Sequence, residues 1–194
     1  ANTNVVGFSS SNAVVLLSKP ATANATGVTF TFSSDTATIA TANTNGMDSL
    51  TGSVIVTANK SYQAGTNYII NGATTKPFGI TSGSAATTID AGFVEINAPV
   101  TVNRSVNIYN HLLINGILTL RPADLMHLFP GAAITGAFSN TKYIAANYTG
   151  AGVQSLIQVD GVTAATTIPV GTTVHYLPVT ITPTTSSDFT VAAF

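Results

Sequence analysis

Residues that could do acid–base chemistry are few and widely spaced in this chain. Glycoside hydrolysis needs two facing carboxylates, and the most suggestive pair is Asp90 and Glu95, about one turn apart if the chain winds in stacked coils. Most acidic residues adjoin Ser, Gly or Ala, as residues in turns do, so we expect turns and solvated strand faces rather than a catalytic or calcium site. The acidic residues are Asp35, Asp48, Asp90, Glu95, Asp124, Asp160 and Asp188.

The histidines His111, His127 and His175 show no spacing typical of metal ligands. No Gly-x-Ser-x-Gly nucleophile elbow and no phosphate-binding glycine loop occurs in the sequence. Cysteine is absent, which excludes thiolate chemistry, disulfides and cysteine-based metal sites. We therefore expect no enzyme, no catalytic residues, no metal ligands and no cofactor, and we interpret His175 as an outward-facing or hydrogen-bonded strand residue.

The composition describes a neutral, hydroxyl-rich surface. Of 194 residues, 7% are charged, against about a quarter in ordinary soluble domains, and the net charge is −1. The six Lys and Arg residues are not clustered, so a footprint for nucleic acid is missing. The longest apolar run near the N-terminus, AVVLL, is far too short to insert into a membrane. Absence of Cys with abundant Thr and Asn is typical of an exported protein, which predicts an extracellular or cell-surface location.

Period-two alternation and β-branched residues dominate the chain, which predicts an all-β fold with almost no helix. Only residues 122–129, PADLMHLF, show helical spacing, enough for one or two turns. Three zones can be separated: an N-terminal β region at 1–87, solenoid-like coils at 88–140 and a C-terminal β module at 141–194. A single continuous domain remains the alternative. Short strands and turn residues in the first zone favour a sandwich or a wall of hairpins.

Residues 88–120 hold an alternating pattern too long for one strand. Asn97, Asn103, Asn110 and Asn115 recur at intervals of five to seven residues, and Asn tolerates the left-handed conformation of a tight corner. The spacing favours stacked coils of a β-solenoid. The rival is a meander with a type I′ turn at Asn115-Gly116. The expected interior residues are Val94, Ile96, Val100, Val102, Val106, Ile108, Leu112, Ile114, Ile117 or Leu118, and Leu120.

The third zone resembles a module of very large secreted cell-surface proteins of the Bacteroidetes. In that module a strand ending in Phe-Pro-Val-Gly is followed by Tyr-x-Pro-Val and by a Phe-Thr-Val strand. This chain has IPVG at 168–171, with Ile168 in place of Phe, then YLPV at 176–179 and FTV at 189–191. Upstream segments such as SYQAGTNYIINGATTKPFG resemble the β-solenoid-like repeats of those proteins, so that the resemblance covers most of residues 28–194.

The resemblance implies a piece of an exported adhesin or filament protein, typically delivered by type IX secretion, although no sorting domain is visible. It also implies O-glycosylation at Asp-Ser/Thr motifs, which makes Thr36 and Ser49 candidate sugar acceptors; ordinary turn chemistry is the alternative at both. N-glycosylation concerns this protein only if its source has that system. The corresponding sequons begin at Asn24, Asn59, Asn103 and Asn147.

Two surface patterns suggest binding functions. Threonines two residues apart share one strand face, as in Thr180 and Thr182, and aligned pairs could bind ice. Tyrosines on one exposed face could stack on sugars; the candidates are Tyr62, Tyr68, Tyr109, Tyr143 and Tyr148. Our leading expectation is a non-catalytic structural and adhesive protein of a cell-surface fibre that self-associates by strand addition, since few charges block its strand edges. The alternative is a module that binds carbohydrate or ice.

Overall fold

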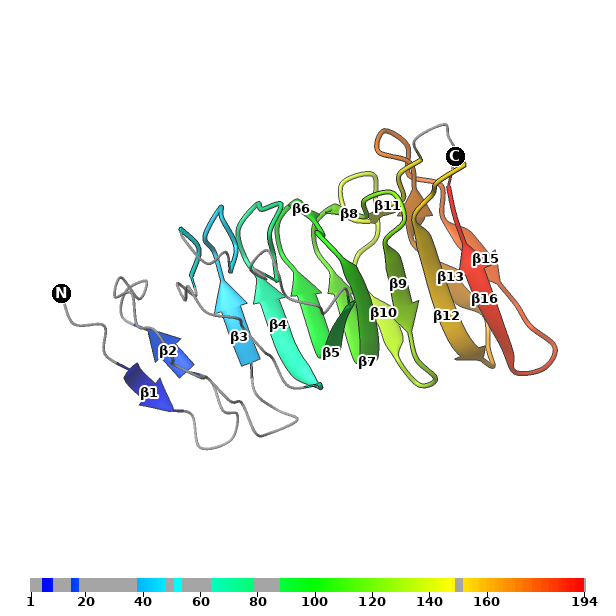
Figure 1. The fold of residues 1–194 in the computed structure, drawn as a ribbon. Coiled ribbons are helices and arrows are strands. Elements are labelled where there is room, and N and C mark those ends of the chain that lie inside the picture. The colour runs from blue at the N-terminus through cyan, green and yellow to red at the C-terminus, as the bar shows by residue number, and fades with distance from the viewer. Residues whose placement is uncertain are drawn as a thin grey trace.

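The computed structural model describes residues 5–8, 15–17, 38–47, 51–53, 64–78, 88–148 and 152–193. These residues form strands and connections without any helix, which confirms the all-β class. Strands follow one another along the molecule from the N- to the C-terminal end (Figure 1). They are β1 Val5–Phe8, β2 Val15–Leu17, β3 Thr38–Thr41, β4 Thr66–Ile70, β5 Thr88–Ile96, β6 Val100–Thr101, β7 Ser105–Ile114, β8 Leu118–Thr119, β9 Leu125–Leu128, β10 Ala133–Thr135, β11 Ile144–Ala145, β12 Leu156–Val162, β13 Thr166–Ile168, β14 Val170–Gly171, β15 Val179–Ile181 and β16 Ser187–Val191.

The largest sheet has eight strands, and most of them are parallel. Its order is β16-β12-β9-β7-β5-β4-β3, and β10 pairs separately with the second half of β7. All neighbours from β3 to β12 run parallel, whereas β16 runs antiparallel to β12. Since β3 and β4 lie in this sheet, the described part of residues 38–78 continues the architecture of residues 88–162.

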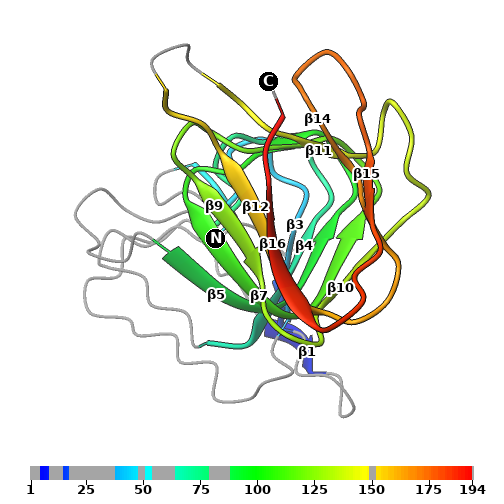
Figure 2. The same cartoon turned by 90° about the vertical axis from the view of Figure 1, so that its right-hand side faces the viewer.

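A second parallel sheet contains the short strands β6, β8, β11 and β14. Its register aligns Val100, Leu118, Ile144 and Val170, which lie 18, 26 and 26 residues apart. An isolated bridge between Thr74 and Val100 extends this alignment by a further 26 residues. The chain therefore passes alternately through the two sheets, and in the end view successive segments superpose around one interior (Figure 2).

The interior is filled by alternate residues of both sheets. The interior residues expected from Val94 to Leu120 are buried. Of the two alternatives left open, Leu118 is buried and Ile117 is only half-buried. Tyr68 and Phe78 extend this core toward the N-terminal side, with their rings edge to face at 5.1 Å between centroids. Fully burying a large apolar side chain stabilises a fold by about 1.5–3 kcal/mol, so this continuous core dominates the stability.

Asparagines stack where strands of the large sheet end. Asn97 Nδ2 donates to Asn71 Oδ1 at 2.8 Å, and Asn115 Nδ2 donates to Asn97 Oδ1 at 2.8 Å. The backbone amides of Asn97 and Asn115 donate to carbonyls of the preceding strand in the large sheet, those of Ile70 on β4 and Ile96 on β5. One passage of the chain through both sheets is called a turn of the stack below. We call Asn71, Asn97 and Asn115 the asparagine ladder. It links three successive turns by side-chain and main-chain hydrogen bonds together.

The structure corrects three details of the sequence analysis that concern these corners. The only non-glycine residue with positive φ in the described ranges is Ala123, so the asparagines are selected for hydrogen bonding and not for left-handed backbone. Asn110 lies inside β7 and not at a corner. A type I′ hairpin at Asn115-Gly116 is wrong, because β7 and β8 belong to different sheets. Gly116 is needed for another reason, since a Cβ there would lie 2.6 Å from the carbonyl oxygen of Ala98.

Residues 122–129 form a strand where one or two helical turns were expected. Ala123 has φ of 68°, which is a turn conformation, and β9 then pairs with both β7 and β12. Met126 and Leu128 point into the core while Leu125 and His127 are half-buried on the other side. Pairing on both edges supplies ladder hydrogen bonds that outweigh the weak helical spacing of this short segment.

Antiparallel pairs flank the parallel part at the described ends. At the C-terminal side, β12 pairs with β16 and β13 pairs with β15; at the N-terminal side, β1 pairs with β2. No sandwich of two packed antiparallel sheets occurs in the described residues. Proline, which cannot donate a ladder hydrogen bond, lies outside the strands here: Pro169 separates β13 from β14, and Pro178 and Pro183 flank β15.

Candidate functional site

Four polar side chains lie side by side on the outward face of the large sheet. The register places Asp90 of β5 beside Asn107 of β7, Asn107 beside His127 of β9, and His127 beside Gln158 of β12. Each is only half-buried, whereas its neighbours in the same strand are buried in the core. We call Asp90, Asn107, His127 and Gln158 the outer row.

The β5 end of the outer row is organised around the Asp90 carboxylate. Asn107 Nδ2 donates to Asp90 Oδ1 at 2.7 Å, and the Tyr109 hydroxyl donates to the same oxygen at 3.3 Å. Partial burial and the neighbouring Asp90 charge raise the pKa of Tyr109, because both disfavour a phenolate. The phenol therefore remains a donor to the carboxylate at neutral pH.

Aromatic rings line the middle of this surface. The rings of Tyr109 and Phe129 stack at 4.6 Å between centroids with an interplanar angle of 25°. The His127 ring lies 4.1 Å from Phe129 at 30°. Phe129 therefore packs against two rings, those of Tyr109 and His127, while Tyr109 remains 39% exposed. Such stacked contacts contribute about 0.5–1.5 kcal/mol each beyond the area that they bury.

At the β12 end of the outer row, a histidine and a carboxylate lie within ion-pair distance. His127 Nε2 lies 2.7 Å from Asp160 Oδ2, and Gln158 Nε2 donates to Asp160 Oδ1 at 2.8 Å. Hydrogen bonds from Gln158 and from His127 lower the pKa of Asp160, because they stabilise its charged form. Asp160 is thus a carboxylate at neutral pH, held by two neighbours that face it from β9 and from its own strand.

These carboxylates are not placed for glycoside hydrolysis. Asp90 and Asp160 lie on strands three steps apart in the sheet, which is about 14 Å at ordinary strand spacing. The two acids of a glycosidase lie about 5–9.5 Å apart. Asp90 and Glu95, the most suggestive pair in the sequence, both lie on β5 and not one turn apart, and Glu95 Oε1 accepts from Asn97 Nδ2 at 2.7 Å.

The other acids expected in turns also have structural partners. Asp124 is buried and accepts from Arg121 through both carboxylate oxygens, at 2.9 and 3.2 Å. Asp188 Oδ1 accepts from the backbone amide of Gly161 at 2.8 Å. Asp35 and Asp48 lie outside the described residues. Every carboxylate in the described ranges therefore accepts a hydrogen bond within the chain.

The remaining histidines lie apart from the outer row. His111, on β7, contacts the Thr135 hydroxyl of β10 through Nε2, and its ring lies 5.4 Å from that of Phe93. His175 is exposed in a turn after β14, where its amide donates to Thr172 Oγ1 at 3.0 Å; it is outward-facing as expected, but it is not within a strand. No group of three or more His, Asp or Glu residues within the described part of the chain could hold a metal ion.

The candidate glycan acceptors are only partly in view. Thr36, Ser49, Asn24 and Asn59 lie outside the described residues. Asn103 and Asn147 are half-buried at corners; the Asn103 carbonyl accepts from Arg121, and the amide of Asn147 donates to Ser155 Oγ at 2.7 Å.

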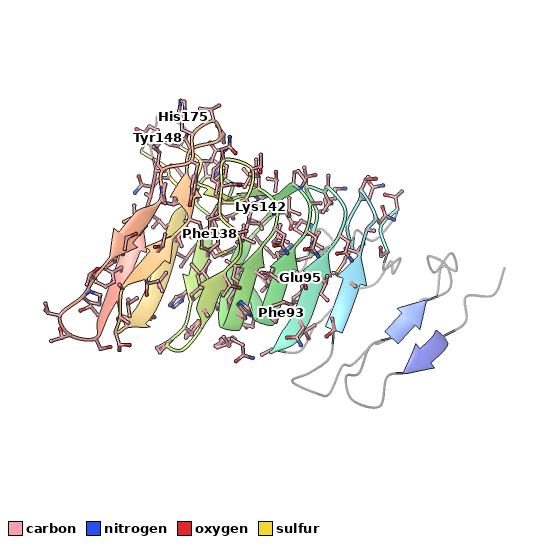
Figure 3. The ribbon with its side chains drawn as sticks, turned by 180° about the vertical axis from the view of Figure 1, so that it is seen from behind. Phe93, Glu95, Phe138, Lys142, Tyr148 and His175 are labelled. Carbon is pink, nitrogen blue, oxygen red and sulfur yellow. The ribbon has the colours of Figure 1, made fainter. Side chains whose placement is uncertain are left out.

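The tyrosine and threonine patterns are dispersed. Tyr68 and Tyr143 are buried, Tyr109 is on β7, and Tyr148 follows β11 toward the C-terminal end of the molecule (Figure 3). Tyr62 lies outside the described residues. Thr180 is hydrogen-bonded at 3.0 Å to Thr167 within the antiparallel pair β13–β15. Thr180 and Thr182 therefore lie at the antiparallel C-terminal end and outside the parallel sheets.

Sequence reasoning missed the outer row, although a signal for it was present. Asn107 alternates with the predicted interior residues Val106 and Ile108, and His127 alternates with Met126 and Leu128. What the sequence alone could not give is the register that brings these strands together.

In the described ranges, no helix has the length and apolar character of a membrane span. Comparisons with protein-family models, curated proteins and solved structures found no match.

Proposed function

We propose that this protein is a non-catalytic structural and adhesive module of an extracellular fibre or a very large surface adhesin. The observation that supports this proposal is the parallel stack itself: from β3 to β12, each strand pairs in parallel with its neighbours, and a second sheet repeats the arrangement. We interpret these turns as the coils of a β-solenoid. Such folds are elongated, because each coil contacts only its neighbours.

The use of polar side chains supports a structural role. Asparagine side chains join successive turns, as in the bond from Asn97 to Asn71, and the single acid of the outer row, Asp90, accepts a hydrogen bond from Asn107 on the next strand. An active site instead needs polar groups aimed at a substrate and held in reach of it. Here the bonds from Asn97 to Asn71 and from Asn107 to Asp90 connect one coil to another, which suits a protein that must resist pulling or proteolysis.

The resemblance to secreted Bacteroidetes surface proteins supports the cellular setting of the proposal. Its motif IPVG, at residues 168–171, provides β14, whose carbonyls accept from the preceding turn, as in the bond from Ala146 to Gly171. A side chain at Gly171 would collide with the carbonyl oxygen of His175, 2.1 Å from a built Cβ. The motif glycine therefore has a packing reason. Export by type IX secretion and glycosylation at Thr36 or Ser49 belong to the same proposal.

Electron microscopy with size-exclusion chromatography over a range of concentrations tests the proposal. We expect rods that associate into longer particles as the concentration rises. A matched assay with plant and bacterial polysaccharides should show no cleavage by the wild type. Cleavage that is lost in Asp160→Asn or Asp90→Asn, but kept in Asp188→Asn, would overturn the non-catalytic part of the proposal.

A second candidate function is carbohydrate binding on the outer row. The specific observation that favours it is an exposed phenol, Tyr109, among amide and carboxylate groups, since aromatic and amide groups are common in binding sites. A glycan array tests this function with Tyr109→Ala, and Tyr148→Ala is the control, because Tyr148 is similarly exposed at another place. Binding that Tyr109→Ala abolishes and Tyr148→Ala retains would support it; absence of binding by the wild type would refute it.

A further inference from the structure

The large sheet ends at β16, and this strand carries few of the devices that block an edge. Among the described residues β16 pairs with β12 alone, through Ile157↔Val191, Gln158↔Thr190 and Val159↔Phe189. Natural edge strands are protected by Lys, Pro, bulges or covering loops. The sequence of β16, SDFTV, contains neither Lys nor Pro and a single charge, Asp188. The one register shift in its pairing with β12 has its extra residue on β12, between Val159 and Val162, and not on β16. Its outer edge is therefore a template for another strand.

The sequence of β16 is complementary to itself in one antiparallel register. With Phe189 opposite Phe189 of a second copy, Asp188 faces Thr190 and Ser187 faces Val191, so all five residues pair. Asp188 then faces a hydroxyl donor, and the half-buried Phe189 rings meet on the inner side. A shift by one pair that centres on Asp188 would place two carboxylates opposite each other. A register that places a core-facing residue opposite a solvent-facing one would join the core face of one sheet to the solvent face of the other.

The surface around this end is suited to burial in an interface. Three exposed large apolar residues lie in the segment that follows β14 and ends in β15, which includes the turn with His175 at the C-terminal end of the molecule (Figure 3). They are Val174, Leu177 and Val179, which are 75%, 50% and 37% exposed. Lys and Arg do not occur after Lys142 in the sequence. Exposed apolar groups with little charge are typical of interaction surfaces.

We propose that two copies of this chain pair through antiparallel β16 strands about a two-fold axis, with Phe189 at the centre. The pairing joins the two large sheets into one continuous sheet and joins two stacks end to end. A two-fold axis requires an isologous, self-complementary contact, which the Asp188–Thr190 pairing provides twice. This inference rests on the proposed function, since it names the edge and the partner for strand addition.

Charge substitutions at Thr190 test the register, with dimerisation measured by sedimentation velocity. Thr190→Asp places two like-charged pairs directly opposite Asp188 and should weaken the dimer by about 2- to 30-fold, while Thr190→Lys creates two opposite-charge pairs and should strengthen it by a similar factor. Thr163→Asp and Thr163→Lys are the matched controls, because Thr163 is exposed in the connection from β12 to β13. Neither control should change the dimer constant by more than about 2-fold.

Cysteine cross-linking tests the same register independently, since the chain contains no cysteine. Residues directly opposite in antiparallel strands have Cβ atoms about 4.5–5.5 Å apart. A mixture of Asp188→Cys and Thr190→Cys chains should therefore form a disulfide-linked heterodimer under mild oxidation, faster than either variant forms a homodimer. Circular dichroism and sedimentation of each variant confirm that it is folded.

The two proposals fail in distinguishable ways. Fibres or larger particles that remain unchanged in all Thr190 variants, with no preferred cross-link, would overturn the pairing through β16 and leave the structural function in place. Monomers at every concentration would overturn the pairing and also remove self-association from the proposed function. Opposite effects of Thr190→Asp and Thr190→Lys, together with the mixed cross-link, would support the pairing.

Discussion

Asn97 occupies the centre of the asparagine ladder, and its replacement measures what the ladder contributes. Its side chain donates to Asn71 and Glu95 and accepts from Asn115, with all three distances between 2.7 and 2.8 Å. A hydrogen bond contributes about 0.5–1.5 kcal/mol to stability, and exposed bonds such as these lie in the lower half of that range. Asn97→Ala should therefore lower the free energy of unfolding by about 1.5–3 kcal/mol. For a chain of this size, that corresponds to a Tm decrease of about 3–12 °C.

The neighbours of Asn97 provide the matched controls. Asn71 and Asn115 each share one side-chain bond with Asn97 within the described residues, so Asn71→Ala and Asn115→Ala should each cost about 0.5–1 kcal/mol. Asn97→Asp keeps an acceptor but loses both donors and places a carboxylate beside Glu95, so it should cost at least as much as Asn97→Ala. Thermal unfolding followed by circular dichroism gives all four values. Equal costs for Asn97→Ala and Asn71→Ala would refute the idea that the ladder acts through these side chains.

Three further predictions follow from the core, the corners and the outer row. Leu112→Ala should cost about 2–5 kcal/mol, because it leaves a cavity in the interior, whereas Leu113→Ala on the opposite face should cost less; chemical denaturation measures both. Gly116→Ala should cost about 1–3 kcal/mol, since its Cβ would lie 2.6 Å from the Ala98 carbonyl; an unchanged Tm would contradict this. Folding lowers the pKa of Asp160, so its carboxylate stabilises the folded protein at any pH above the unfolded-state pKa of about 3.9. This stabilisation disappears as the pH falls through the folded-state pKa. The Tm difference between wild type and Asp160→Asn should therefore persist at pH 5–7 and shrink below about pH 4.

The class of the fold and its interior could be predicted from the sequence, because they depend on local alternation. Period two is a property of a strand by itself, so Val106, Ile108, Leu112 and Ile114 could be placed in the core without a partner strand. Ladder positions could be predicted in part: Asn97 and Asn115 end two long strands, but Asn110 lies within β7. Composition does not distinguish an asparagine that stacks on another turn from one that points to solvent.

The outer row could not be predicted, because it depends on pairing between strands distant in sequence. Asp90 and Asn107 are 17 residues apart, whereas His127 and Asp160 are 33 apart. The turn length also changes, from 26 residues between Thr74 and Val100 to 18 between Val100 and Leu118. A change of eight residues alters the register with no visible change in alternation. Spacing in the sequence therefore suggested a partner for Asp90 on its own strand, when its partners lie on the next one.

The change of strand direction at β16 limits how the stack can grow. Each strand from β3 to β12 accepts a parallel neighbour, so the winding could continue with further turns of the same kind. Strand β16 reverses direction, so a further strand that ran in the direction of β3 to β12 would pair antiparallel with β16. Antiparallel pairing is slightly more stable per residue than parallel pairing, which favours a partner strand that runs opposite to β16. A second β16 related by two-fold symmetry meets that requirement and also opposes Asp188 to Thr190, which is why we expect growth at this end to occur by pairing of whole stacks.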